Sequence, residues 1–257
     1  MRDLAGTAWP EVPERPPVLV PVGSTEQHGP HLPLNTDTVI ARAVAERAAA
    51  VLGDTILVAP AVAYGSSGEH AGFPGTVSIG RDVLELVLVE TVRSLALWAG
   101  RVVFVNGHGG NTAALDAAVG RMRAEGHDAG WVGCGVPGGD AHAGFTETSV
   151  MLHLAPELVR SSRAVAGDTR PIAELLPELV ARGVREVSPS GVLGDPAGAS
   201  AERGREIVDA MTASTVHRIH AWRADARGRL APPGTERERE PGRAGARGGV
   251  LDPGAAT

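Results

Sequence analysis

The chain has almost no cysteine and no lysine. Cys134 is the only cysteine among 257 residues, so no disulfide can form within the chain. A chain that folds without disulfides is typical of a reducing compartment, and we expect a cytoplasmic protein. All 24 basic residues are arginine, which excludes a phosphate-binding P-loop, because that motif requires a lysine.

The sequence also lacks long apolar runs and an excess of positive charge. No stretch is long and apolar enough to span a membrane, and the first residues carry acids and prolines instead of the basic and apolar regions of a signal peptide. The net charge is −6, without a basic stripe for nucleic acid. We therefore expect neither a membrane nor a nucleic acid as partner.

The remaining composition is that of an ordinary globular domain, with 43% hydrophobic and 21% charged residues. Apolar runs alternate with segments of helical periodicity, which predicts an α/β fold with a mostly parallel sheet covered on both faces. The expected strands are residues 17–22, 56–61, 102–105 and 130–133. The expected helices are residues 37–52, 81–99, 112–125 and 144–154.

The chain divides into three parts. Residues 1–16 form an N-terminal lead-in, and residues 17–231 form a single domain. Residues 232–257 are rich in Pro, Gly, Arg and Glu and contain almost no large apolar side chain. Such a segment cannot bury enough surface to offset its ordering entropy, so we expect a disordered tail.

Acidic and imidazole side chains follow two of the expected strands. Glu26 and His28 come after the first strand and His108 after the third, while Asp37 opens the first helix. In open α/β sheets the carboxyl ends of the strands are where sites are built. This oxygen and nitrogen ligand set contains no thiolate and suits zinc, manganese or ferrous iron.

Glu26 and His28 are separated by one residue, so on extended chain both side chains point to the same face and could serve two neighbouring metals. An isolated pair of this kind is usually a solvated carboxylate beside a surface histidine, and Asp37 alone could be an ordinary first-turn acid. The joint occurrence at strand ends favours the metal interpretation. We assign four other histidines to the surface or to packing: His127, His153, His217 and His220.

A second cluster contains Asp140, His142 and Glu147. Glu147 should lie in the first turn of a helix, where it could simply complement the helix dipole. His142 could be a loop histidine bonded to Asp140, or a group at the mouth of the site. His31 and His70 lie in loops that should face the site, and the sequence leaves their roles open.

Six motifs together resemble the creatininase family, over residues 18–221. They are VGSTEQHG at 22–29, NTD at 35–37, EHAGFPGT at 69–76, NGHGGN at 106–111, HAGFTETS at 142–149 and GVLGDP at 191–196. The resemblance implies a single-domain, three-layer αβα sandwich. It also implies a metal-dependent amidohydrolase with two adjacent divalent metal ions, assembled as a homo-oligomer.

The resemblance also implies roles for individual residues. Glu26, Asp37 and His108 would hold one metal, and His28 and Asp37 the other, with Asp37 bridging. Members that act on creatinine carry a glutamate ligand where this chain has Gly110, so the second metal needs another carboxylate, for which Glu147 is the candidate. His142 would give a proton to the leaving amine.

Within the family, the short form with NGHGGN is most similar to the peptidases of the mycofactocin system, which release a C-terminal Val-Tyr dipeptide from a precursor peptide. Creatinine enzymes enclose their substrate with tryptophans, but this chain has no further tryptophan between Trp131 and His142, so creatinine is a less suitable substrate. The alternatives are a deformylase or amidohydrolase acting on a formamide or small cyclic amide, and a non-catalytic metal-binding scaffold.

The tail gives the first testable prediction. Deleting residues 232–257 should leave the melting temperature and the activity unchanged, because nothing in this segment can join a hydrophobic core. A large fall in melting temperature, measured by calorimetry, would show that the tail docks on the domain or on a neighbouring subunit.

Overall fold

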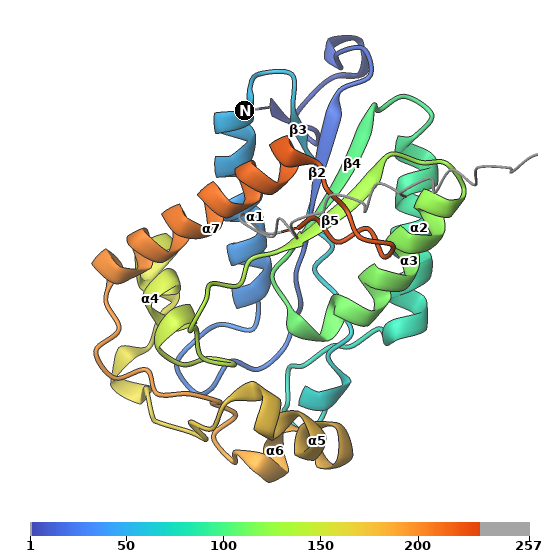
Figure 1. Cartoon of the computed structure of the whole chain (residues 1–257). Helices are drawn as coiled ribbons and strands as arrows, with labels where there is room; N and C mark the ends of the chain where they lie inside the picture. Colours follow the sequence, from blue (N-terminus) through green and yellow to red (C-terminus); the bar gives the residue numbers. More distant parts are fainter. Residues whose placement is uncertain (1, 232–257) are drawn as a thin grey trace, which may run out of the picture.

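The computed structural model describes residues 2–231, which form a five-stranded sheet with helices around it (Figure 1). Along the sheet the strands follow the order β1-β3-β2-β4-β5, and every neighbouring pair is parallel. The strands are β1 (Arg2–Asp3), β2 (Pro17–Val22), β3 (Leu57–Val58), β4 (Arg101–Asn106) and β5 (Ala129–Gly133).

Five helices pack around the sheet, and further helical segments lie between them. The five are α1 (Thr36–Leu52), α2 (Arg81–Leu95), α3 (Thr112–Ala124), α4 (Phe145–Leu154) and α7 (Ala201–Ala221). The others are α5 (Ile172–Arg182) and α6 (Val184–Val187), with the 3₁₀ segments η1 (Trp9–Glu11), η2 (Gly68–His70), η3 (Gly109–Asn111), η4 (Pro156–Leu158) and η5 (Ser161–Arg163).

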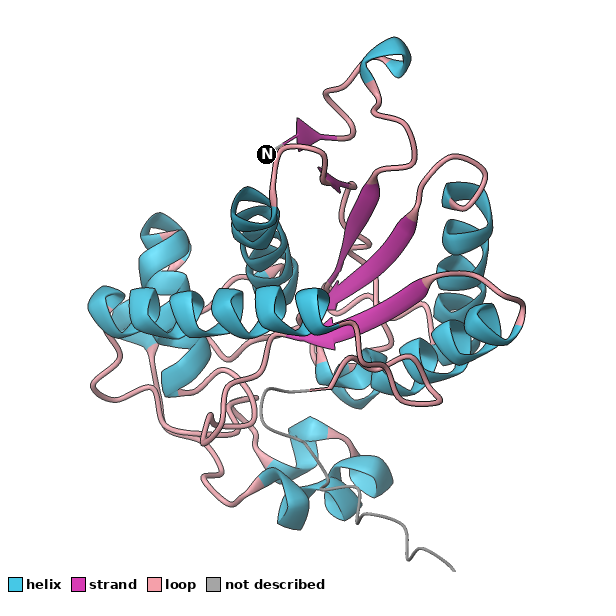
Figure 2. Cartoon of the chain, turned by 45° about the horizontal axis from the view of Figure 1, so that its top comes forward, coloured by secondary structure: helices cyan, strands magenta, loops and turns pink. Residues whose placement is uncertain are grey.

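The helices form one layer on each face of the sheet (Figure 2). Helices α1, α4 and α7 pack together on one face, and α2 and α3 pack together on the other. The predicted three-layer αβα sandwich with a parallel sheet is therefore confirmed.

Successive side chains along the strands point to opposite faces of the sheet and so belong to two different hydrophobic cores. On β2, Val18 and Val20 join the core under α2 and α3, while Leu19 joins the core under α1, α4 and α7. On β4, Phe104 joins the core under α2 and α3, and Val103 joins the core under α1, α4 and α7. Because both faces are covered, these strands are apolar throughout and not alternating in polarity.

Two predicted elements are shorter than expected. The strand expected at 56–61 is only Leu57–Val58, because Pro60 has no N–H to donate to the sheet. The chain nevertheless stays beside β2, where Val62 N donates to Pro21 O. Helix α2 ends at Leu95, ahead of the predicted residue 99. The chain must turn there to enter β4, and Gly100 N donates to Pro16 O.

No helix within residues 2–231 is long and apolar enough to cross a membrane. The short strand β1 lies within the expected lead-in and pairs with β3 at the edge of the sheet, a contact the sequence did not indicate. The predicted disordered tail, residues 232–257, lies outside the described residues.

The start of α1 is pressed against the ends of two neighbouring strands. A Cβ on Gly23, just after β2, would lie 2.4 Å from Thr38 Cα, and a Cβ on Gly107, just after β4, would lie 2.4 Å from Asp37 O. Glycine is needed at both positions because the backbones approach so closely. This packing holds the Asp37 side chain at the carboxyl ends of β2 and β4.

Gly23→Ala should therefore destabilise the protein by about 1–3 kcal/mol, the usual cost of overpacking a close contact. The matched control is Gly135→Ala, because a Cβ there would meet no atom within 4 Å. The control should change the free energy of unfolding by less than about 0.5 kcal/mol. Urea unfolding curves that are equal for the two variants would contradict this account of how α1 is positioned.

Candidate metal centre

Asp37 is the centre of a buried cluster of acids and imidazoles. Its Oδ1 lies 3.2 Å from His28 Nε2, and its Oδ2 lies 3.2 Å from His108 Nδ1. Glu26 lies 3.2 Å from His108, and Glu147 lies 3.9 Å from His28. The structure thus brings together all five residues that the sequence predicted as metal ligands.

Polar contacts fix Asp37 and the loops that follow the strands. Ser24 Oγ donates to Asp37 Oδ2 at 2.7 Å. Asn111 Nδ2 donates to Gly23 O at 2.9 Å, which ties the loop after β4 to the loop after β2. Asn106 Nδ2 donates to His108 O at 2.7 Å and so fixes the backbone next to that imidazole. Each loop that carries a candidate ligand is therefore held by a buried side chain.

Backbone carbonyls orient the two candidate ligand histidines. His28 Nδ1 lies 3.1 Å from Glu26 O, and His108 Nε2 lies 3.2 Å from Ser66 O. A carbonyl oxygen can only accept, so each of these nitrogens carries a hydrogen. The opposite nitrogens, His28 Nε2 and His108 Nδ1, face Asp37. Support of a ligand histidine through its second nitrogen is usual in metal sites.

Glu26 shows most directly that this site suits a cation. Its side chain is fully buried, and neither carboxylate oxygen has a hydrogen bond within the described part of the chain. His108 and His70 lie 3.2 and 3.4 Å from these oxygens without forming a hydrogen bond to them. A buried carboxylate without hydrogen bonds is costly, and coordination of a metal ion is a usual solution. The hard oxygen and nitrogen donors around it fit zinc, manganese or iron.

The pKa values in the cluster also indicate that the buried acids are stabilised by positive charge. Burial acts to raise the pKa of Glu26 and of Asp37, but the neighbouring imidazoles outweigh it and lower the pKa of Glu26 to about 2. Burial acts to lower the pKa of His28, but Asp37 outweighs it and raises that pKa to about 10. Protons on imidazoles balance the buried acids here, and a divalent cation would supply the same charge.

His142 and Glu147 lie beside His28. The rings of His28 and His142 are 4.3 Å apart between centroids. Glu147 is in the first turn of α4, and its Oε2 accepts a hydrogen bond from Ala143 N at 2.6 Å. Ala143 has a φ of 52°, an uncommon conformation for a residue with a side chain, and it aims this N–H at Glu147. Burial raises the pKa of Glu147 to about 7.

The other histidines divide as the sequence suggested, with two refinements. Three histidines lie outside the cluster. His153 pairs with Arg47, while His217 and His220 line a groove between α1 and α7. His31 is buried, and its Nε2 lies 2.8 Å from Thr148 Oγ1. His142 contacts Gln27 and not Asp140, which instead accepts from Thr146 N at the start of α4.

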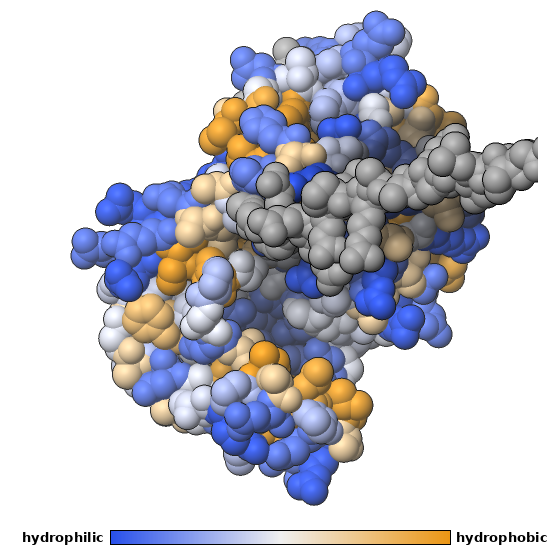
Figure 3. Space-filling model, viewed as in Figure 1, coloured by the Kyte–Doolittle hydropathy of each residue, from blue (hydrophilic) through white to orange (hydrophobic). Residues whose placement is uncertain are grey.

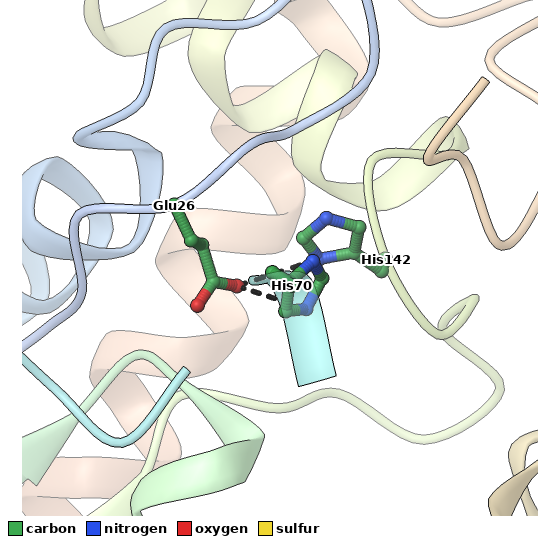
Figure 4. A group of neighbouring side chains, drawn as sticks. All are labelled: Glu26, His70 and His142. Carbon is green, nitrogen blue, oxygen red and sulfur yellow. Dashed lines mark ion pairs between the residues drawn. The ribbon is translucent and has the colours of Figure 1, made fainter. Parts of the chain in front are cut away.

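Three residues near the centre had no assigned role in the sequence analysis. His70 Nε2 lies 3.4 Å from Glu26 Oε1 (Figure 4). Gln27 Nε2 lies 2.8 Å from His70 Nδ1. Glu69 Oε1 lies 3.5 Å from His108 Nε2, and its side chain is 31% exposed. Glu69 and His70 belong to the sequence motif at 69–76, but only the tertiary structure shows that this loop lies beside Glu26.

Three groups of side chains have donor atoms within 4.8 Å of one another and could hold an ion. They are Glu26 with His28 and Asp37, His28 with His142 and Glu147, and Glu26 with His70 and His142. The first two groups share His28 and together contain Asp37 and Glu147. The cluster therefore contains candidate metal-binding side chains in more than one combination.

Fold and site together define a metal-binding α/β protein of hydrolase type. The sequence model of the creatininase family, described as creatinine amidohydrolase, matches residues 5–219. The chain belongs to the creatininase family. It is 57% identical over 219 residues to a protein of Mycolicibacterium smegmatis described as mycofactocin precursor peptide peptidase, covering 84% of this chain and 89% of that protein.

Solved creatininase structures share the fold and contain metal ions. One described as a Mn creatininase superposes with a TM-score of 0.70 at 27% identity and covers 85% of this chain and 97% of its own. A creatininase variant described as Zn-Zn type has a TM-score of 0.69 at 27% identity, with the same coverage. These neighbours agree with the zinc or manganese chemistry expected from the donor set.

The roles of the acids can be separated by metal analysis. Asp37→Ala should lose both metal ions, because its two oxygens face different histidines. Glu147→Ala should lose only the ion beside His28. Inductively coupled plasma measurement on protein reconstituted with zinc gives the metal content directly.

Glu174→Ala is the matched control, since Glu174 is also a first-turn glutamate, in α5, but is exposed. This variant should keep both ions. Equal metal loss from Asp37→Ala and Glu147→Ala would undo the assignment of Asp37 as the shared ligand.

Proposed function

We propose that the protein is a dinuclear metal-dependent amide hydrolase whose substrate is a peptide. The observation that carries the proposal is the division of Asp37 between two imidazoles, His28 and His108, beside the Glu26 oxygens, which make no hydrogen bond within the described residues. Glu26, Asp37 and His108 would hold one ion, and His28, Asp37 and Glu147 the other. Two such ions would supply an acidified water nucleophile and polarise the substrate carbonyl.

His142 is placed to carry the proton of the reaction. Its Nε2 lies 2.8 Å from Gln27 O and therefore carries a hydrogen, and burial holds the pKa of the ring well below its usual range. The ring is then neutral, and its Nδ1 has a free lone pair 3.9 Å from Glu26 Oε1. This nitrogen can take the proton that the attacking water loses and pass it to the leaving amine nitrogen.

The surroundings of the site suit an extended chain better than a small ring. The surface is hollowed between the body of the protein and the lobe of α5 and α6 (Figure 3). A Cβ on Gly68 or Gly138 would meet no atom within 4 Å, so these loops leave open space. Gly65 and Gly139, in contrast, pack against Asn111 and Val136 and support the loops from within.

A peptide substrate also agrees with the 57% identical relative described as a mycofactocin precursor peptide peptidase. We extend that description to this chain and expect release of a C-terminal Val-Tyr dipeptide. A non-catalytic scaffold would not need a site open to solvent, and the side chains of Glu69 and Glu147 are 31% and 19% exposed.

A panel of substrates tests the proposed function. The purified enzyme should cleave a precursor peptide ending in Val-Tyr and show little turnover of creatinine or of a formylaminopyrimidine. Chromatography of the products identifies the bond that is cut. Efficient creatinine turnover without peptide cleavage would refute the assignment.

His142→Ala should lower turnover of the peptide by about 10²–10⁴-fold, the usual effect of losing a general acid or base. Its metal content should stay that of the unaltered protein, because His142 carries protons in this mechanism and does not hold the ions. His153→Ala is the control, since that histidine lies outside the cluster beside Arg47. Loss of metal from His142→Ala would show that His142 is a ligand.

A further inference from the structure

Four imidazoles surround the buried acids, and one of them is held differently from the rest. Three have one ring nitrogen at a backbone carbonyl, which leaves the other nitrogen facing the acids. These contacts are His28 Nδ1 to Glu26 O at 3.1 Å, His108 Nε2 to Ser66 O at 3.2 Å and His142 Nε2 to Gln27 O at 2.8 Å. His70 has a side-chain amide, that of Gln27, in the corresponding place.

The orientation of the Gln27 amide follows from an unambiguous donor. Gly29 N lies 2.9 Å from Gln27 Oε1, and a backbone N–H can only donate, so this atom is the carbonyl oxygen. The NH₂ group therefore points the other way and has two hydrogens to give. Gly191 O, at 3.1 Å, can only accept and takes one of them.

The second hydrogen goes to His70. His142 Nε2 is also within 3.1 Å of the amide nitrogen, but its own hydrogen is directed to Gln27 O, so it cannot accept. His70 Nδ1, at 2.8 Å, is the closer partner and accepts. A neutral imidazole that accepts at Nδ1 carries its hydrogen on Nε2. The nitrogen that lies 3.4 Å from Glu26 Oε1 is therefore an N–H.

We propose that Gln27 is a positioning residue that turns the Nε2–H of His70, and not a lone pair, toward Glu26 and so keeps His70 out of the metal-ligand set. By distance alone, His70 could join Glu26 and His142 around an ion, but its lone pair is turned away from them. His70 then orients Glu26, a role that outer partners of metal ligands commonly have. The proposal rests on the proposed metal site but not on the substrate.

Nitrogen NMR of the full-length protein, labelled with ¹⁵N and loaded with zinc, reads the tautomer directly. His70, assigned by its loss in His70→Gln, should carry its proton on Nε2 and show an uncoordinated, unprotonated Nδ1. The same tautomer should be present before zinc is added. A zinc-coordinated Nε2, or a proton on Nδ1, would overturn the proposal.

The nearly isosteric substitution Gln27→Glu tests whether Gln27 sets the tautomer of His70. A carboxylate can only accept, so His70 should move its proton to Nδ1, and the signals of its two nitrogens should exchange. An unchanged tautomer in Gln27→Glu would show that Gln27 does not set it.

Measurements of zinc affinity distinguish a hydrogen-bond donor role of His70 from a role as a metal ligand. His70→Phe removes the N–H and should weaken zinc binding about 10–100-fold, as losses of outer partners do. His70→Gln places an amide N–H near the original Nε2 and should bind zinc like the unaltered protein. Equal weakening in the two variants would overturn the donor role. Failure of the unaltered protein to bind zinc would instead refute the proposed metal site, while the tautomer would still be readable.

Discussion

The site depends on the close approach of α1 to the ends of β2 and β4. Gly23 and Gly107 let the first turn of α1 touch both strand ends, and this contact places the Asp37 carboxylate between His28 and His108. A side chain at either glycine would separate these parts. The parallel sheet thus does more than support the site, because the spacing of two adjacent strands determines which donors can share one carboxylate.

Burial explains why these groups act together. Glu26, His28 and Asp37 are almost completely removed from solvent, and each of their charges is compensated by a neighbour a few ångströms away. Removal of one partner would leave a buried charge uncompensated, which is strongly unfavourable. Backbone carbonyls direct the ring nitrogens so that lone pairs and hydrogens fall on opposite sides of each imidazole. The result is a site with a fixed distribution of donors and acceptors.

The sequence predicted the parts of this arrangement that depend on local pattern. Strand β2 occurs at the predicted residues, Pro17–Val22, and α1 begins one residue before the predicted start at Asp37, because apolar runs and helical periodicity are local signals. The convergence of His108 with Glu26 followed from the general rule for strand ends. Coverage of the sheet on both faces followed from the alternation of strands and helices. The division of ligands between two ions came from the family resemblance and stays a prediction.

The parts that were missed depend on contacts between distant segments. Gln27 lies between two predicted ligands, but its role is visible only when His70 and Gly191 are brought to it by other loops. Glu69 likewise reaches His108 from the loop before α2. The lobe of α5 and α6 was not predicted, although Leu175 and Leu179 on α5 are buried beside exposed Ile172 and Leu176.

The central claim is that Asp37 is shared between two metal ions. Crystals of the zinc-loaded protein, measured at wavelengths on both sides of the zinc absorption edge, test it most directly. The account predicts two anomalous peaks, one at each oxygen of Asp37, one beside His28 and the other beside His108, and none within bonding distance of His70. A single peak, or a pair of peaks without Asp37 between them, would contradict it.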